Sequence, residues 1–138
     1  METKIISGGL SVDDRGSVTF VNDFNFSDVK RFYVVENHRS GFIRAWHGHE
    51  KEGKYVFVVK GTALIGAVDM RSDSPNKCIL SDRSPKILYI PPGYANGFKT
   101  LEEDTRIIFY STSTLQDSLG DDVRFPFDKW NIWEEDFR

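Results

Sequence analysis

Short, largely apolar runs recur at regular intervals along most of the chain with polar and turn residues between them, as is typical of β-strands. These stretches are rich in β-branched and aromatic residues, and Gly, Pro, Asp or Asn bounds most of them. Tight turns are predicted at Lys60-Gly61 and at Pro91-Pro92-Gly93. The strands predicted in this way are Ser17–Val21, Arg31–Val35, Phe42–Trp46, Tyr55–Val59, Thr62–Val68, Ile87–Ile90 and Arg106–Ser111.

Helical patterns are weak by comparison. Only Ser113–Leu119 and the last few residues are candidates for helix, and neither segment has a clear helical period. No repeat, linker or change of composition divides the 138 residues, which is about the length of one domain. Many evenly spaced strands with turn residues between them predict a single all-β domain over residues 1–138, either a sandwich or a barrel.

Composition narrows the classes of partner. The net charge is −3 with both signs interspersed, which argues against nucleic acid as a partner. The single Cys78 cannot form an intramolecular disulfide, as expected in a reducing compartment. No apolar run approaches the roughly 18 residues of a membrane span, and METKIISGGL lacks the features of a signal peptide. We therefore expect a cytoplasmic protein that binds neither nucleic acid nor membrane.

One segment has a glycine, two histidines separated by one residue, a lysine and a second glycine. These residues are Gly41, His47, His49, Lys54 and Gly61. Their layout resembles the first conserved motif of the cupins, which are small β-barrels of the double-stranded β-helix or jelly-roll type. In cupins that bind a metal, both histidines are ligands, and a glutamate stands where this chain has Lys54.

A second cupin-like motif, Pro91-Pro92-Gly93, is followed by Asn96, where metal-binding cupins carry their last histidine ligand. Lys54 repels a divalent cation and offers it no electron pair, so only His47 and His49 remain as ligands. Three protein ligands are the usual minimum for a catalytic metal site. The sequence therefore predicts a site that uses neither a metal nor another cofactor.

The same residues suit a different chemistry. Alternation places His47 and His49 on one face of a strand. A histidine and Lys54 that both face into the barrel would place a base beside a cation. That pair suits removal of a proton next to a carbonyl group, because the cation stabilises the oxygen anion that forms. The simpler alternative is that one histidine is a core residue and the other is merely exposed.

Six segments between Gly9 and Trp133 resemble, in the same order, conserved segments of the dTDP-4-dehydrorhamnose 3,5-epimerase family, a metal-free group of cupins. The resemblance spans nearly the whole chain. The segments are Asp13–Gly16, Asn37-His38 with Ile43–His47, Lys54–Gly61, Val68–Arg71, Ser74-Pro75 and Leu88–Phe98.

The resemblance implies an enzyme that epimerises a nucleotide-linked 4-keto-6-deoxy-sugar for deoxysugar and polysaccharide biosynthesis, in a homodimer. It also implies that His47 is the catalytic base and that Lys54 stabilises the enolate. Arg15 and Arg44 match arginines that contact the nucleotide or its diphosphate, which a guanidinium group binds through two parallel hydrogen bonds. Because dimers of this family share their sites, Arg15 is a candidate to contact the substrate in the site of the neighbouring subunit. The further candidates for substrate binding are Tyr33, Asn96 and Arg71.

The chain departs from the family pattern at the residue that acts as the general acid. Family members carry a tyrosine acid shortly after the strand that matches Ile107–Tyr110, but Leu115 and Gln116 stand there in this chain. The remaining candidates are Tyr110, Tyr33 and a water molecule. The aspartate that orients the base histidine in the family lies in a longer C-terminal segment, for which Asp136 is the nearest substitute.

Two functions other than epimerisation are also compatible with the sequence. The segments Asp14–Ser17 and Val29–Tyr33 resemble the dTDP-sugar 3,4-ketoisomerases more than the epimerases, and in that group His49 is the expected base. The third alternative is a cupin that binds a sugar or nucleotide without catalysis. The later motifs favour an epimerase that acts at C3, C5 or both.

Overall fold

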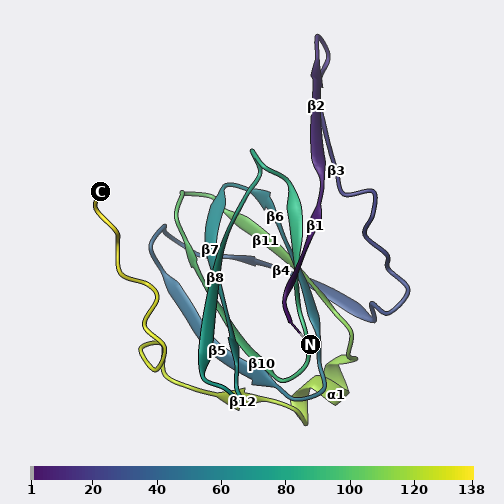
Figure 1. The fold of residues 1–138 in the computed structure, drawn as a ribbon. Helices are drawn as coiled ribbons and strands as arrows, with labels where there is room; N and C mark the ends of the chain where they lie inside the picture. Colours follow the sequence, from purple (N-terminus) through teal and green to yellow (C-terminus); the bar gives the residue numbers. More distant parts are fainter. Residues whose placement is uncertain (1) are drawn as a thin grey trace.

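The computed structural model describes residues 2–138 and consists of two five-stranded antiparallel sheets and a separate β-hairpin (Figure 1). The first sheet has the strand order β1-β9-β6-β11-β4 and the second β12-β5-β10-β7-β8. The strands are β1 (Lys4–Ser7), β2 (Gly9–Asp13), β3 (Gly16–Phe20), β4 (Arg31–Glu36), β5 (Ile43–His49), β6 (Lys54–Lys60), β7 (Thr62–Asp69), β8 (Ser74–Ser81), β9 (Lys86–Ile90), β10 (Tyr94–Thr100), β11 (Arg106–Ser111) and β12 (Val123–Arg124).

The main core lies between the two sheets and consists of side chains that alternate inward along the strands. Its buried members include Val56, Val58, Ile65, Leu80, Leu88, Phe98, Ile107 and Phe109. All seven strands predicted from the short apolar runs fall on observed strands, with shifts of one to three residues at some ends. The prediction of an all-β barrel is therefore confirmed.

The strands β1, β2, β8, β10 and β12 were not predicted. The strand β10 contains two residues with low strand propensity, Asn96 and Gly97. A Cβ atom on Gly97 would lie 2.5 Å from the Cβ of Ala45, so the glycine permits the close approach of β10 to β5. The register between these two strands shifts between Asn96 and Phe98, which re-aims the side chains next to the cavity described below.

The C-terminal segment covers the outer face of the second sheet (Figure 1). A second apolar cluster forms there, in which Trp46 of β5 packs against Trp130 and Trp133. The indole Nε1 atoms of Trp46 and Trp133 both donate to the main-chain oxygen of Phe127, at 3.1 and 3.0 Å. These contacts fix β5 from the outside, so its other face is presented rigidly to the interior.

The single helix of the described chain, α1 (Leu115–Leu119), links β11 to β12. Thr114 caps it, because its hydroxyl oxygen accepts the main-chain N–H of Asp117 at 3.1 Å. The short helix falls in the segment that the sequence singled out as a candidate. No helix among residues 2–138 is long and apolar enough to cross a membrane.

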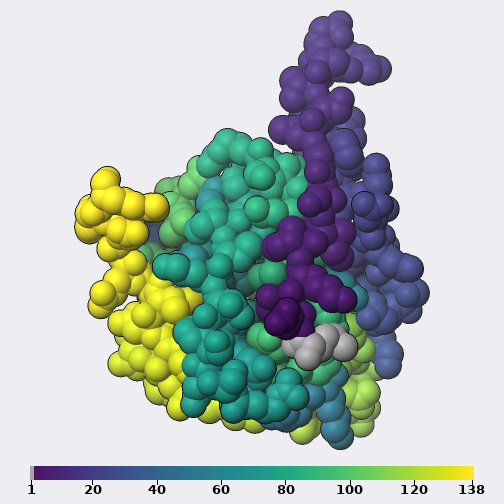
Figure 2. Space-filling model, viewed as in Figure 1, coloured from purple at the N-terminus to yellow at the C-terminus, as the bar shows by residue number. Residues whose placement is uncertain are grey.

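The hairpin of β2 and β3 stands clear of the barrel (Figures 1 and 2). Pairing places Leu10 and Val12 on one of its faces and Val18 and Phe20 on the other. All four side chains are exposed, and Val12 is 70% exposed. A two-stranded ribbon on its own is only marginally stable in water, so this hairpin needs another surface to pack against.

Candidate active site

Two adjoining cavities open at the end of the barrel beside α1. The first cavity has a volume of about 250 Å³ and the second about 150 Å³, and Tyr33, His47 and Lys54 line both. The first is also lined by Arg31, His49, Leu115, Ser118, Leu119, Asp122 and Arg124. The second is also lined by Val35, Arg44, Asn96, Phe98 and Phe109.

His47 and His49 lie two residues apart on β5, and both face the first cavity. The intervening Gly48 faces the other way, since a Cβ atom there would lie 2.6 Å from the sulfur of Met70 and 3.4 Å from the ring of Phe125. The alternation predicted from the HxH pattern therefore holds at this strand.

Both ring nitrogens of His49 are engaged. Nδ1 contacts the main-chain oxygen of Asp121 closely and lies 3.4 Å from Oε1 of Glu52. Nε2 lies 3.4 Å from Nζ of Lys54. Because a carbonyl oxygen only accepts, we assign the proton to Nδ1 and the lone pair to Nε2, which then accepts from the ammonium group.

His47 has no hydrogen-bond partner for its ring among residues 2–138, and it is half-buried where the two cavities meet. Burial, together with the charges of Arg124 and Lys54, lowers the pKa of His47 to about 4, and Asp122 opposes the shift. The imidazole is therefore neutral near pH 7. A neutral imidazole with a free nitrogen that faces a cavity is able to accept a proton from a bound molecule.

Lys54 begins β6 and is only 6% exposed. Its Nζ lies 3.4 Å from Nε2 of His49 and 3.4 Å from Oδ1 of Asn96. It also lies 5.9 Å from the ring centroid of Tyr33 and 5.8 Å from that of Phe109, within cation–π range. Burial lowers the pKa of Lys54, and the carboxylate of Glu52 counteracts this.

The structure therefore brings together six of the nine predicted site residues, namely His47, His49, Lys54, Tyr33, Arg44 and Asn96. Within residues 2–138, no three His, Cys, Asp or Glu side chains form a group that suits a metal ion. The Lys54 ammonium occupies the centre of the site, beside the histidine whose counterpart would hold a metal in other cupins.

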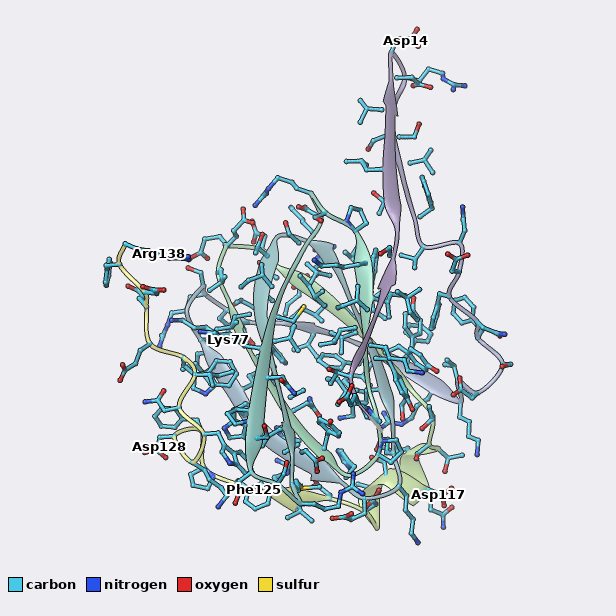
Figure 3. The ribbon with its side chains drawn as sticks, in the orientation of Figure 1. Asp14, Lys77, Asp117, Phe125, Asp128 and Arg138 are labelled. Atoms are coloured by element: carbon cyan, nitrogen blue, oxygen red, sulfur yellow. The ribbon has the colours of Figure 1, made fainter. Side chains whose placement is uncertain are left out.

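Arg15 and Arg71 lie outside both cavities. Arg15 is at the turn of the hairpin, is 86% exposed and binds its own neighbour Asp13 at 2.6 Å. In Figure 3 the adjacent Asp14 and the α1 residue Asp117 lie at opposite ends of the molecule. Arg71 follows β7 and pairs with Asp69 at 3.3 Å on the surface. Neither arginine reaches the cavities within one copy of the chain.

Tyr110 also lies outside the site. It is on the outer face of the first sheet, where its ring packs against Phe24 and Phe26. Its neighbour Phe109 faces inward and stacks on Tyr33, with ring centroids 5.2 Å apart. Of the two tyrosines considered as acids, only Tyr33 therefore lies in the cavities.

Asp136, the C-terminal candidate for the carboxylate that orients the base histidine, also lies outside the site. Asp136 is exposed and pairs with Arg138 at 3.3 Å, away from the cavities. The carboxylate that lies with His47 in the first cavity belongs instead to Asp122, whose Oδ2 accepts from Nε of Arg124 at 3.1 Å.

Sequence reasoning missed the group of charged residues that surrounds the first cavity. Arg124 pairs with His47 in the register of β12 against β5. The carboxylate of Asp121 accepts the main-chain N–H groups of the loop before β6, namely those of Glu50, Lys51 and Glu52 at 2.8, 2.8 and 3.2 Å. No periodic signal marks these residues, because only the long-range pairing of β12 brings them to the site.

Arg31 was missed for a different reason. It alternates with Tyr33 and Val35 along β4, and all three face the cavities. Since Tyr33 was already a candidate, the two-residue period of the strand was a usable signal for Arg31.

Comparison with known proteins gives a family match over residues 3–131, to the model described as dTDP-4-dehydrorhamnose 3,5-epimerase. The spore coat polysaccharide biosynthesis protein SpsL of Bacillus subtilis is 33% identical over 107 residues, which are 71% of each chain. The dTDP-4-dehydrorhamnose 3,5-epimerase of Neisseria gonorrhoeae is 32% identical over 124 residues. That alignment covers 80% of this chain but only 38% of the relative.

Two solved structures are also similar. The Bacillus anthracis dTDP-4-dehydrorhamnose 3,5-epimerase with TDP and pyrophosphate bound is 25% identical, with a TM-score of 0.78 over 94% of this chain and 80% of that one. A 3,4-ketoisomerase from Helicobacter canadensis is 20% identical, with a TM-score of 0.72 over 94% of each chain. The second likeness shows a shared fold.

Proposed function

Because the chain belongs to the dTDP-4-dehydrorhamnose 3,5-epimerase family, we propose that it epimerises a nucleotide-linked 4-keto-6-deoxy-hexose at C3, C5 or both. The observation that carries this proposal is the pair formed by the His47 imidazole and the buried Lys54 ammonium in one cavity. An epimerisation next to a ketone needs both a base for the proton and a stabiliser for the enolate.

In the proposed reaction, His47 accepts the proton from the carbon next to the C4 ketone. The electron pair of the broken C–H bond becomes the carbon–carbon double bond of the enolate, and negative charge develops on the C4 oxygen. Lys54 donates a hydrogen bond to that oxygen. Its low exposure favours this role, because a cation acts more strongly where water is excluded.

The proton must then return to the opposite face of the carbon, and we assign this step to Tyr33. Its side chain lines both cavities with His47. Burial raises the pKa of Tyr33, the charge of Glu52 raises it further, and Arg31 opposes the shift. The phenol is therefore protonated at neutral pH and holds a proton to give.

We assign binding of the nucleotide's diphosphate to the arginines that line the cavities. Arg31 and Arg124 line the first cavity and Arg44 the second. Planar guanidinium groups bind phosphate through paired, charge-assisted hydrogen bonds. The similar enzyme from Bacillus anthracis is described with TDP and pyrophosphate bound, so a thymidine diphosphate sugar is the substrate to test first.

The 3,4-ketoisomerase alternative requires His49 as the base. In this structure Nδ1 of His49 contacts the Asp121 carbonyl and Nε2 faces the Lys54 ammonium. A ring with both nitrogens engaged is poorly placed to accept a substrate proton, whereas His47 is open to both cavities. This difference supports the epimerase.

The test is proton NMR of a dTDP-4-keto-6-deoxy-glucose with the protein in D2O. We expect the C3 proton signal, the C5 signal or both to disappear as deuterium enters from solvent. A new 3-keto product would identify a ketoisomerase instead. An unchanged spectrum with dTDP-, GDP-, UDP- and CDP-linked keto-sugars would contradict any catalytic role and leave a binding protein.

A homodimer is proposed on the basis of the hairpin and the adjacent sheet. Phe32 and Val34 on the outer face of the first sheet are largely exposed, as are Val12 and Val18 on the hairpin. Exposed apolar surface of this kind is typical of an interface. A partner that covers the hairpin would also place Arg15, at its turn, against the neighbouring subunit rather than against its own cavity.

This arrangement gives a prediction for oligomeric state. Val12→Glu introduces a charge into the proposed contact, and we expect it to weaken dimerisation at least about tenfold, equal to about 1.4 kcal/mol. Size-exclusion chromatography with light scattering at several protein concentrations measures the change. Phe137→Glu is the control, because Phe137 is 88% exposed on the C-terminal segment. A wild-type monomer, or an equal response of both variants, would contradict the proposed dimer.

A further inference from the structure

Glu52 is a charged residue that the proposed reaction does not yet use. It lies in the loop between β5 and β6, three residues after His49 and two before Lys54. Its side chain is wholly buried, with an exposed fraction of 0%. A carboxylate is seldom buried to this extent unless it is paired and hydrogen-bonded, because removing it from water is costly.

The Glu52 carboxylate contacts residues of three strands, two of which, Arg31 and His49, line the first cavity. Oε2 accepts the hydroxyl of Ser111 of β11 at 2.6 Å and lies 3.4 Å from Nη2 of Arg31 of β4. Oε1 lies 3.4 Å from Nδ1 of His49 of β5. Oε1 has no hydrogen-bond donor among residues 2–138, so it acts on the neutral His49 ring as a nearby negative charge that favours the proton on Nδ1.

We propose that Glu52 is a positioning residue, whose carboxylate orients the His49 imidazole and, through Nε2 of that ring, holds the Lys54 ammonium in the cavity. The proposal rests on the proposed function, in which Lys54 stabilises the enolate. The chain of contacts runs from Glu52 through His49 to Lys54, and Asn96 completes it on the far side.

Charge gives Glu52 a second effect on the same lysine. Burial lowers the pKa of Lys54, and the negative charge of Glu52 is the foremost group that opposes this. The other charged groups near Lys54 partly cancel, since Arg31 and Arg124 lower its pKa and Asp122 raises it. Loss of the Glu52 charge therefore lets Lys54 lose its proton at a lower pH, and a neutral amine stabilises an enolate less.

The titratable rings around Lys54 are His47 and His49 on β5 and Tyr33 on β4. His47 is neutral near pH 7 because burial lowers its pKa, and burial keeps Tyr33 protonated by raising its pKa. Neither His47 nor Tyr33 therefore carries a negative charge that could replace that of Glu52.

Glu52 itself stays ionised at neutral pH. Burial alone would raise the pKa of Glu52. Hydrogen bonds from Ser111 and Ser118, with the nearby charge of Lys54, outweigh burial and lower the pKa of Glu52. The main chain of the loop is held separately by the Asp121 carboxylate, so replacing the Glu52 side chain leaves the loop anchored.

Three variants separate orientation from charge. Glu52→Gln keeps the shape of the side chain but removes its charge, and Glu52→Asp keeps the charge but shortens the reach to His49. Glu50→Gln is the matched control, because Glu50 is exposed in the same loop. Steady-state kinetics over a range of pH are measured with the keto-sugar, and carbon-13 NMR of the Lys54 side chain is recorded over the same range.

For Glu52→Gln we expect kcat to fall about tenfold or more with KM within about threefold. The alkaline limb of its pH profile and the Lys54 titration should both move to lower pH by about one unit. Glu52→Asp should lower kcat and leave the alkaline limb in place, and Glu50→Gln should behave as wild type.

Wild-type kcat and an unmoved Lys54 titration in Glu52→Gln would overturn the proposal, as would equal effects of Glu50→Gln. If Glu52→Gln does not fold, Ser111→Ala removes one bond to the carboxylate, and wild-type kcat in that variant would then count against the proposal. The Lys54 titration needs no substrate. A protein without epimerase activity therefore contradicts the proposed function while the link from Glu52 to Lys54 is still tested.

Discussion

His47→Asn is expected to abolish incorporation of solvent deuterium into the keto-sugar and to lower kcat roughly a thousandfold. The substitution removes the one open imidazole of the cavity and keeps a polar side chain of similar size. His38→Asn is the matched control, since His38 is exposed outside both cavities. Substrate affinity, measured by calorimetry, should stay within about threefold because the arginines are untouched.

The pH dependence gives His47 a second signature. A base must be unprotonated to act, so the rate falls as pH decreases through its pKa. Burial, with Arg124 and Lys54, lowers that pKa to about 4, so kcat/KM should remain level down to about pH 5. In the complex the negative diphosphate offsets Arg124, and the acid limb of kcat should therefore lie at higher pH than that of kcat/KM.

The comparison with His49→Asn decides between the two histidines. His49→Asn removes a contact of Lys54 but leaves His47 open, so we expect a smaller loss of kcat and continued deuterium exchange. Exchange that survives in His47→Asn and disappears in His49→Asn would make His49 the base and the protein a ketoisomerase.

The pattern of short β-branched and aromatic runs with turn residues between them was sufficient to predict the fold class. It failed for β8, an edge strand whose residues are mostly exposed. It also failed for β10, where Asn96 and Gly97 serve the cavity and the close approach to β5 rather than strand propensity. Strands shaped by a site or an edge carry a weaker periodic signal.

The centre of the site was predictable because its residues lie close together in sequence. His47, His49 and Lys54 fall within eight positions of one strand–loop–strand unit. The charged residues that surround the first cavity were not predictable. Arg124 comes to His47 only through the pairing of β12 with β5, and the contact of His49 with Asp121 spans 72 positions.

The choice between tyrosines needed the structure for another reason. The strand Arg106–Ser111 is apolar at Ile107, Ile108, Phe109 and Tyr110, so alternation does not reveal which face is internal. The outer face is apolar as well, because it packs against Phe24 and Phe26. The two-residue period therefore places Tyr110 opposite to Phe109 but does not say which of them lies inside.

Lys54→Met is expected to lower kcat about a hundredfold to a thousandfold, because the enolate oxygen loses its buried cation. The variant should fold, since Glu52 keeps its contacts with Arg31 and Ser111 when the ammonium is removed. Lys51→Met is the control, as Lys51 is exposed in the same loop. Deuterium exchange should slow in parallel with kcat, because forming the enolate is the step that suffers.

The double variant Lys54→Met with Glu52→Gln connects this prediction with the role of Glu52. If Glu52 acts through Lys54, its substitution adds little once the lysine is gone, and the two effects on kcat are far from additive. Additive effects would mean that Glu52 serves the reaction by a separate route, through Arg31 or Ser111. Retention of wild-type kcat by Lys54→Met would remove the cation from the mechanism and leave the enolate to be stabilised by other donors that line the cavities, such as Arg31, Arg44 and Tyr33.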